Sequence, residues 1–188
     1  MTNPIIAAWL VAAMKTWVSI TEHSEEAATA TARYEELAND YLVVAQSEAP
    51  LFKHDDDRLR TLTLLASVES FEGSFAKGKI LGDKHPVTKA PRAFCGMQIQ
   101  PGPTGLVFEG DMWNYAKPGD PEAITGDMLL ADHQLCVRMG LHMLRASFRH
   151  TGDLGEYTGE GRGGKKSKQR LDRATWWFTN KRKELQES

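Results

Sequence analysis

One glutamate of this sequence occupies a position from which it could act as a buried acid. In the segment Leu59 to Gly73, LRTLTLLASVESFEG, the apolar side chains recur at helical spacing, and Glu69 falls on the same stripe. A helix that docks by this stripe turns the Glu69 carboxyl toward the core, where glutamate is rarely found without a partner. A carboxyl group in apolar surroundings has a raised pKa, so it can stay protonated near neutral pH and act as a general acid. The alternative is that the last helical turn is exposed and that Glu69 reaches solvent.

Three other carboxylates could take part in acid–base chemistry. Glu72 follows three residues after Glu69 and could be a second acid or a substrate contact, but an exposed position at the helix end is the expected one. Asp83 and Asp111 lie further along the chain and are alternative second carboxylates. If either approaches Glu69 at roughly 6.5–9.5 Å, the two carboxyl groups could act as an acid and a base with a water molecule between them.

Helices must position most of these residues. Asn3-Pro4 is a good helix start, because asparagine caps the first turn and proline suits the first helical position. From there to about residue 45 no glycine or proline interrupts the sequence, which predicts one long helix or two with a break near Ser19 to Ser24. Asp55-Asp56-Asp57 can cap the helix of Glu69, and Gly73 is its expected end.

The segment from Gly73 to Gly126 is rich in glycine and proline, which predicts long loops with a few short strands. Loops of this length inside a folded domain are usually functional. A buried central helix is expected over about Asp127 to His150. Its apolar face carries Leu129, His133, Cys136, Met139, Gly140, Met143 and Leu144. On that face we expect His133 to be a core histidine with satisfied nitrogens rather than a ligand.

The C-terminal part is predicted to be a polar, glycine-rich loop over Thr151 to Lys166, followed by a basic helix over Ser167 to about Leu185. This helix carries Trp176, Trp177 and Phe178, and aromatic residues at this spacing are expected in the core. Its lysines and arginines could contact an anionic partner, but no recognition motif accompanies them, so nucleic acid is not predicted as a partner.

Composition limits the class of protein that this sequence can form. Of the 188 residues 41% are apolar, which is enough for a real core. The apolar run Ile5 to Val18 is shorter than the roughly 18 residues that a spanning helix needs, so no stable membrane insertion is predicted. No basic segment precedes it, so no signal peptide is visible. The two cysteines, Cys95 and Cys136, have no zinc-like spacing, so neither a metal nor a cofactor is predicted.

Three short motifs occur in order along the chain. They are Glu69-Ser70 at a helix end, AFCGMQIQP at residues 93–101, and Tyr157-Thr158-Gly159 before a helix. Together they resemble the lysozyme-like superfamily, in the branch of soluble lytic transglycosylases and goose-type lysozymes, over about residues 57 to 180. The sequence departs from the family pattern at Cys95 and Gly96, which replace glycine and leucine, and at Thr158, which replaces asparagine. The stretch Lys77 to Arg92 looks like an insertion.

The resemblance implies a role for each matching residue. Glu69 would be the single catalytic acid, which later acts as a base. Gln98 would line the cleft and bind substrate or order the loop, and Tyr157 would orient the Glu69 carboxyl by a hydrogen bond. The other residues expected to bind substrate are Ser70, Met97 and Thr158, although for Met97 ordinary packing is the favoured interpretation.

Two further expectations concern the loops. In the fold that the resemblance implies, the loop with Cys95 packs over the helix with Cys136, so a disulfide between them is a reasonable hypothesis. Trp113 and Tyr115 could stack on sugar rings or could anchor their loop to the body of the protein, and the sequence favours neither.

We therefore expect a mainly α, lysozyme-like domain with long active-site loops. Residues 1–50 would form an N-terminal helical extension, and residues 51–188 the catalytic domain. The implied activity is cleavage of the β-1,4 bond between N-acetylmuramic acid and N-acetylglucosamine in peptidoglycan glycan strands, most simply by a lytic transglycosylase. A phage endolysin or virion-associated protein, or one acting on a periplasmic cell wall, would fit. The alternatives are a goose-type or chitinase-like hydrolase, and a non-catalytic virion or interaction protein with this fold. A third alternative, a nucleic-acid-binding helical protein, rests only on the basic C-terminal helix.

Overall fold

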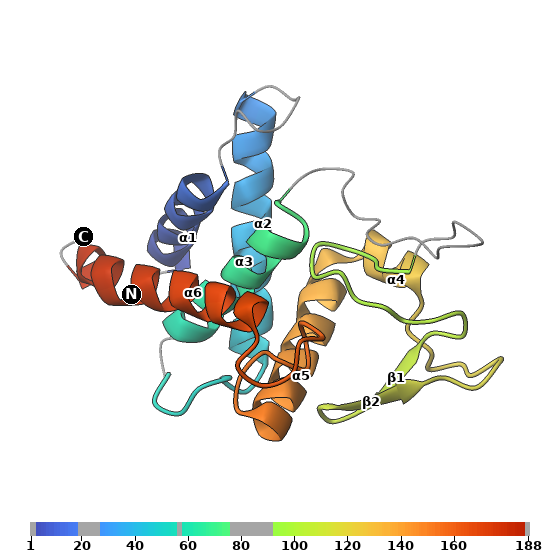
Figure 1. Ribbon diagram of the computed structural model, residues 1–188. Helices are drawn as coiled ribbons and strands as arrows, with labels where there is room; N and C mark the ends of the chain where they lie inside the picture. The colour runs from blue at the N-terminus through green and yellow to red at the C-terminus, as the bar shows by residue number, and fades with distance from the viewer. Residues whose placement is uncertain (1–2, 19–26, 56–57, 76–91, 187–188) are drawn as a thin grey trace.

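The computed structural model describes residues 3–18, 27–55, 58–75 and 92–186, and in these ranges the protein is mainly helical (Figure 1). Six helices and one two-stranded sheet follow one another along the described chain. Their bounds are α1 Asn3–Trp17, α2 Ala27–Ser47, α3 Leu59–Glu72, β1 Leu106–Glu109, β2 Met112–Tyr115, α4 Gly126–Ala131, α5 His133–Thr151 and α6 Lys165–Gln186. The predicted mainly α class is confirmed.

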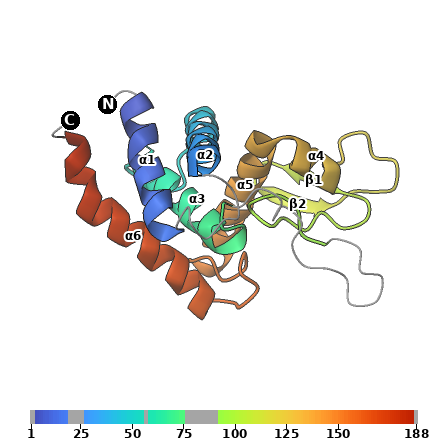
Figure 2. The same ribbon diagram turned by 90° about the horizontal axis from the view of Figure 1, so that it is seen from above.

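Helix α3 lies at the centre of the helical body. Most of its side chains are buried, and it contacts α1, α2, α5 and α6. Residues from all of these helices belong to one hydrophobic core. The first fifty residues, predicted as an extension, thus contribute α1 and α2 to the same core as the rest of the chain. Figure 2 shows α4 and the hairpin at the end of the molecule opposite to α6.

The start of α3 is fixed by Asp55, one of the three aspartates predicted to cap it. The Asp55 carboxylate accepts hydrogen bonds from the backbone N–H groups of Arg60 and Thr61, at 2.9 and 2.8 Å. These N–H groups lie in the first turn and have no partner within the helix. Asp56 and Asp57 lie outside the described residues. The helix ends at Gly73, as predicted.

Two helices replace the single one predicted over Asp127 to His150. The chain is extended at Asp132, between α4 and α5, and the Asp132 carboxylate accepts from the backbone N–H of Leu135. An aspartate side chain that bonds to nearby backbone competes with helix continuation and starts a new helix instead. The first 45 residues likewise contain two helices, and the predicted break at Ser19 to Ser24 lies outside the described residues.

The predicted short strands are an antiparallel hairpin. Strand β1 pairs with β2 in the register Leu106 to Tyr115 and Glu109 to Met112. A separate bridge between Phe94 and Ile99 closes a small loop, described below. Within the parts of the chain that are described, no helix is both long and apolar enough to cross a membrane.

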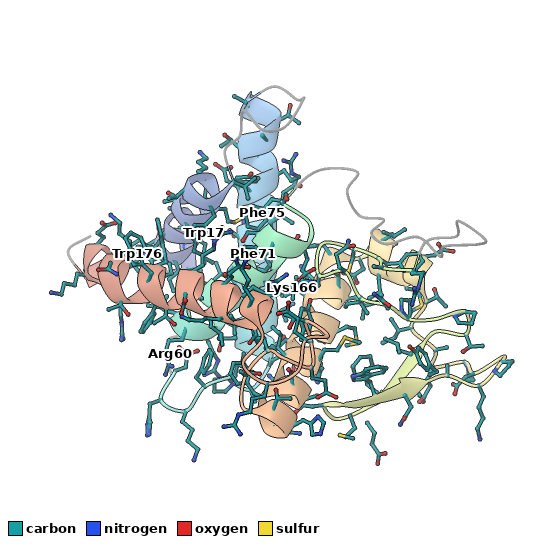
Figure 3. The ribbon with its side chains drawn as sticks, viewed as in Figure 1. Trp17, Arg60, Phe71, Phe75, Lys166 and Trp176 are labelled. Carbon is teal, nitrogen blue, oxygen red and sulfur yellow. A yellow bond between two sulfur atoms is a disulfide. The ribbon has the colours of Figure 1, made fainter. Side chains whose placement is uncertain are left out.

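The aromatic residues of α6 only partly follow the prediction that they are core. Trp177 is buried against Trp9 and Trp17 of α1, with ring centroids 6.0 and 5.8 Å away. Trp176 is 54% exposed, because it lies on another side of the same helix. Figure 3 shows Phe71 of α3 beside α6, and Lys166 at the end of α6 that lies nearest α5.

Candidate functional site

Glu69 is buried at the end of α3, with 2% of its surface exposed. The helix therefore docks by the stripe that the sequence predicts. The carboxyl does not lie in apolar surroundings, however, because the Tyr41 hydroxyl of α2 donates to Glu69 Oε2 at 2.7 Å. Glu69 thus turns toward the core, as predicted, and α2 supplies a partner for its carboxyl there.

His133 is the second partner of Glu69. Its Nε2 lies 3.2 Å from Glu69 Oε2, and its Nδ1 lies 2.8 Å from Oδ2 of Asp40. Both ring nitrogens are satisfied, as expected for a core histidine. The partners are nevertheless two carboxylates, and 23% of the imidazole side chain is exposed. His133 thus joins a buried carboxylate to a partly exposed one.

The charges around His133 favour its protonated form. Burial lowers the pKa of His133, but the charge of Glu69 and the hydrogen bond to Asp40 outweigh it and raise the pKa to about 10. The N-terminus of α5, where His133 lies, disfavours a cation by only about 0.3–1 kcal/mol. Hydrogen bonds to charged groups contribute about 1.5–3 kcal/mol each, so the two carboxylates dominate.

The pKa values of Tyr41 and Asp40, which lie beside His133 and Glu69, are also shifted. Burial and the charge of Glu69 raise the pKa of Tyr41 well above its ordinary value, so the hydroxyl stays neutral and remains a donor. Burial raises the pKa of Asp40, but the hydrogen bonds from His133 and Gln134 outweigh it, and the net pKa is lowered. At neutral pH an imidazolium therefore lies between carboxyl groups of α2 and α3.

The loop of residues 93–101 covers the Glu69 carboxyl. A disulfide joins Cys95 of this loop to Cys136 of α5, which confirms the pairing hypothesis. Gly96, the next residue, lies so close to the carboxyl that a Cβ there would be 1.9 Å from Glu69 Oε1. Glycine at this position therefore lets the loop backbone approach the acid.

An open groove of about 470 Å³ lies next to this loop. Its lining combines aromatic, amide and charged side chains from this loop, the end of α3, the hairpin, α5, the loop before α6 and α6 itself. The lining residues are Glu72, Ala93, Gln98, Ile99, Gln100, Trp113, Tyr115, Met143, Ala146, Glu156, Tyr157, Thr158, Gly159, Lys166 and Arg170. Of the residues predicted to bind substrate, Gln98, Tyr157 and Thr158 line it, whereas Glu69, Ser70 and Met97 are not among its lining residues.

Tyr157 does not hydrogen-bond Glu69, so that part of the prediction is wrong. Its hydroxyl donates instead to the backbone carbonyl of Met97 at 2.5 Å. The glycine-rich loop that carries Tyr157 is held by Asp153, whose carboxylate accepts from the backbone N–H groups of Gly155 and Gly163. This anchoring directs the phenol to the cleft-forming loop rather than to the acid.

The other predicted residues have structural contacts. The Gln98 amide donates to the carbonyl of Cys95 at 2.8 Å, which orders the loop from within. Met97 is buried, and a Cβ on Gly140 of α5 would meet its side chain. Ser70 is buried as well, and its hydroxyl accepts from the Arg173 guanidinium at 2.6 Å.

Glu72 and Asp111 are both held by cations. Glu72, expected to be exposed, is ion-paired with the buried Arg170 of α6, whose Nε lies 3.0 Å from its Oε1. Asp111 at the hairpin turn contacts Arg145 and His142 of α5 at 3.1 and 2.7 Å. Burial raises the pKa of Asp111, but these two hydrogen bonds outweigh it, and the net pKa is lowered. Asp83 lies outside the described residues.

Sequence reasoning missed Asp40, Tyr41 and Arg170. The spacing of Tyr34, Ala38, Tyr41 and Ala45 in α2 is typical of a buried helical stripe, so the burial of Tyr41 could have been predicted. Its contact with Glu69 could not, because a stripe does not say which helix it meets. Among the described residues no group of three or more His, Cys, Asp or Glu could hold a metal ion.

Comparisons with known proteins add no family assignment. No family model matches the chain, and neither a curated protein nor a solved structure matches it.

Proposed function

We propose that this chain has a lysozyme-like fold and cleaves the β-1,4 bond between N-acetylmuramic acid and N-acetylglucosamine in peptidoglycan, acting as a lytic transglycosylase. One observation carries the proposal: the buried carboxyl of Glu69 lies beneath the loop of residues 93–101, and the same loop lines an open groove. The disulfide at Cys95 anchors this loop to α5. Gly96 touches the carboxyl, and Gln98, two residues further, faces the groove. The acid and the space for a polymeric substrate thus share one loop.

The chemistry requires one group that gives and takes a proton. Glu69 protonates the glycosidic oxygen as the bond to the anomeric carbon breaks. The 6-hydroxyl of the same N-acetylmuramic acid then attacks that carbon, and its proton returns to Glu69 as a 1,6-anhydro ring closes. This cycle needs no second carboxylate, and Asp111 is already bound to Arg145 and His142.

Glu72 is the rival acid, because it lines the groove. Its carboxyl is instead engaged in an ion pair with the buried guanidinium of Arg170. Glu72 is therefore suited to hold Arg170 at the groove wall, where its guanidinium can contact an anionic or carbonyl group of the substrate.

The test is digestion of purified peptidoglycan sacculi with mass spectrometry of the released products. The unmodified protein is expected to release muropeptides with 1,6-anhydro ends. Glu69→Gln should lower the rate by a factor of about 100 or more, because the amide keeps the Tyr41 contact but cannot transfer a proton. Glu36→Gln, at an exposed position of α2, is the matched control and should leave the rate unchanged.

Other products would decide between the alternatives. Reducing ends in place of anhydro ends would identify a goose-type or chitinase-like hydrolase, in which water attacks instead of the 6-hydroxyl. Binding of sacculi without any release of product would indicate a non-catalytic virion or interaction protein. An undiminished rate for Glu69→Gln would remove Glu69 from the mechanism.

A further inference from the structure

A buried acid needs a route by which its proton is replaced. Glu69 is 2% exposed, and its carboxyl is covered by Tyr41 and Gly96. His133 touches that carboxyl and has 23% of its side chain exposed, while Asp40 behind it has 24%. The imidazole of His133 thus contacts the buried carboxyl on one side and solvent on the other.

We propose that His133, oriented by Asp40, holds the proton that Glu69 delivers to its substrate and takes back afterwards. The inference rests on the proposed function, because it gives positioning residues to that same acid. Asp40, Glu69 and His133 come from α2, α3 and α5, so the arrangement is produced by helix packing rather than by a local motif.

The hydrogen bonds leave one ring nitrogen for exchange. Asp40 Oδ2 accepts from His133 Nδ1 at 2.8 Å, and the Gln134 amide donates to the other oxygen of Asp40 at 2.9 Å. The Asp40 carboxylate is therefore fixed, and it keeps a hydrogen on Nδ1 in both charge states of the ring. Only the proton on Nε2 is exchanged, and Nε2 faces Glu69 at 3.2 Å.

The groups that face the imidazole favour a cation there. From α2 they are Asp40 and the neutral Tyr41, whose ring centroid lies 5.8 Å from that of His133. Helix α3 contributes Glu69. Asp132, the cap of α5, directly precedes His133 in the chain. The raised pKa of His133, about 10, agrees with this set of neighbours. The resting proton is therefore held on His133.

The step conserves atoms and charge. The Nε2 proton passes to Glu69 Oε2 and from there to the glycosidic oxygen. The bond from that oxygen to the anomeric carbon breaks, and the electron pair stays on the oxygen. A new bond forms between the anomeric carbon and the 6-hydroxyl oxygen, whose proton passes through Glu69 back to Nε2.

A pH profile of sacculus digestion tests the inference. Activity of the unmodified protein should persist into the alkaline range, because the proton leaves the pair only near the high pKa of His133. His133→Gln can still donate a hydrogen bond to Glu69 but cannot store a proton, so its alkaline limb should move down by several pH units, toward the carboxylic range. Asp40→Asn should move the limb in the same direction by less. His150→Gln, at the exposed end of α5, is the matched control and should leave the profile unchanged.

A second measurement does not depend on activity. In a nuclear magnetic resonance titration of the imidazoles, His133 should remain doubly protonated above pH 8, and Glu69→Gln should lower its midpoint by about 1 to 3 pH units.

Each outcome has a distinct meaning. A His133 midpoint near the ordinary value of about 6.5 would overturn the relay. So would a His133→Gln variant that is slowed equally at every pH, because that describes a structural role. Absence of product from the unmodified protein at every pH would overturn the proposed function instead, and with it the catalytic use of the pair.

Discussion

Gly96 lies against the carboxyl of Glu69 so closely that no other residue type fits there without displacing the acid. A Cβ built on Gly96 would be 1.9 Å from Oε1 and 2.3 Å from the carboxyl carbon. Real Cβ atoms do not approach another heavy atom to this distance, so the loop or the glutamate would have to move. The close contact with the buried acid thus explains why residue 96 is a glycine.

Gly96→Ala is expected to reduce both stability and activity. The added methyl group pushes against a buried carboxyl that is held by Tyr41 and His133, and overpacking of this kind costs about 1–3 kcal/mol. Urea unfolding and sacculus digestion measure the two effects. Gly110→Asn in the hairpin turn is the control, because Gly110 has open space around it and asparagine tolerates its positive φ of 61°. Equal stability of the two variants would contradict the close contact.

Reduction of the Cys95–Cys136 disulfide should lower the free energy of unfolding by about 3–4 kcal/mol, because the bond closes a loop between residues 41 apart in sequence. The chain has two cysteines, so a reductant acts on this bond alone. Urea unfolding with and without reductant measures the difference, and the Cys95→Ser/Cys136→Ser variant, insensitive to reductant, is the control. An unchanged midpoint would show that the bond does not stabilise the fold.

Stability should fall between neutral and alkaline pH because of His133. Its folded-state pKa, about 10, lies above the ordinary value of about 6.5, so its contribution is complete below pH 6.5 and is lost as the pH rises toward 10. Urea midpoints of the unmodified protein from pH 6 to 10 should decline more steeply than those of His133→Gln. His150→Gln should follow the unmodified protein. Parallel slopes for all three would contradict the assigned charge on His133.

If the groove binds glycan strands, as proposed, replacement of Trp113 by alanine should weaken binding to sacculi about tenfold, a loss typical of an aromatic anchor. Trp113 lines the groove and meets Tyr115 edge to face, with centroids 5.9 Å apart. Binding to sacculi is best measured in the Glu69→Gln background, where turnover does not remove the ligand. Trp176→Ala removes an exposed tryptophan that is not part of the groove, and it should bind as before. If Trp113→Ala loses stability but not affinity, the tryptophan only anchors its hairpin.

The sequence predicts the parts of this site that depend on periodicity within one segment. The stripe of α3 predicts that Glu69 faces inward, because the apolar residues before it define one face. The pairing of Cys95 with Cys136 followed from a resemblance. Neither source predicts Tyr41 or Asp40 as partners of Glu69 and His133, since those contacts depend on how separate helices pack. The resemblance also predicts the wrong acceptor for the Tyr157 hydroxyl, because Asp153 anchors the loop of Tyr157 through contacts that the motif does not include.

The partners of Glu69 lie far from it in the sequence, which bears on when its site can form during folding. Tyr41 reaches Glu69 from 28 residues upstream, and His133 reaches it from 64 residues downstream. A nascent chain, or one that has lost a docked helix, carries the glutamate without its partners. The hydrogen bonds that surround the Glu69 carboxyl can therefore form only after α2, α3 and α5 have packed together.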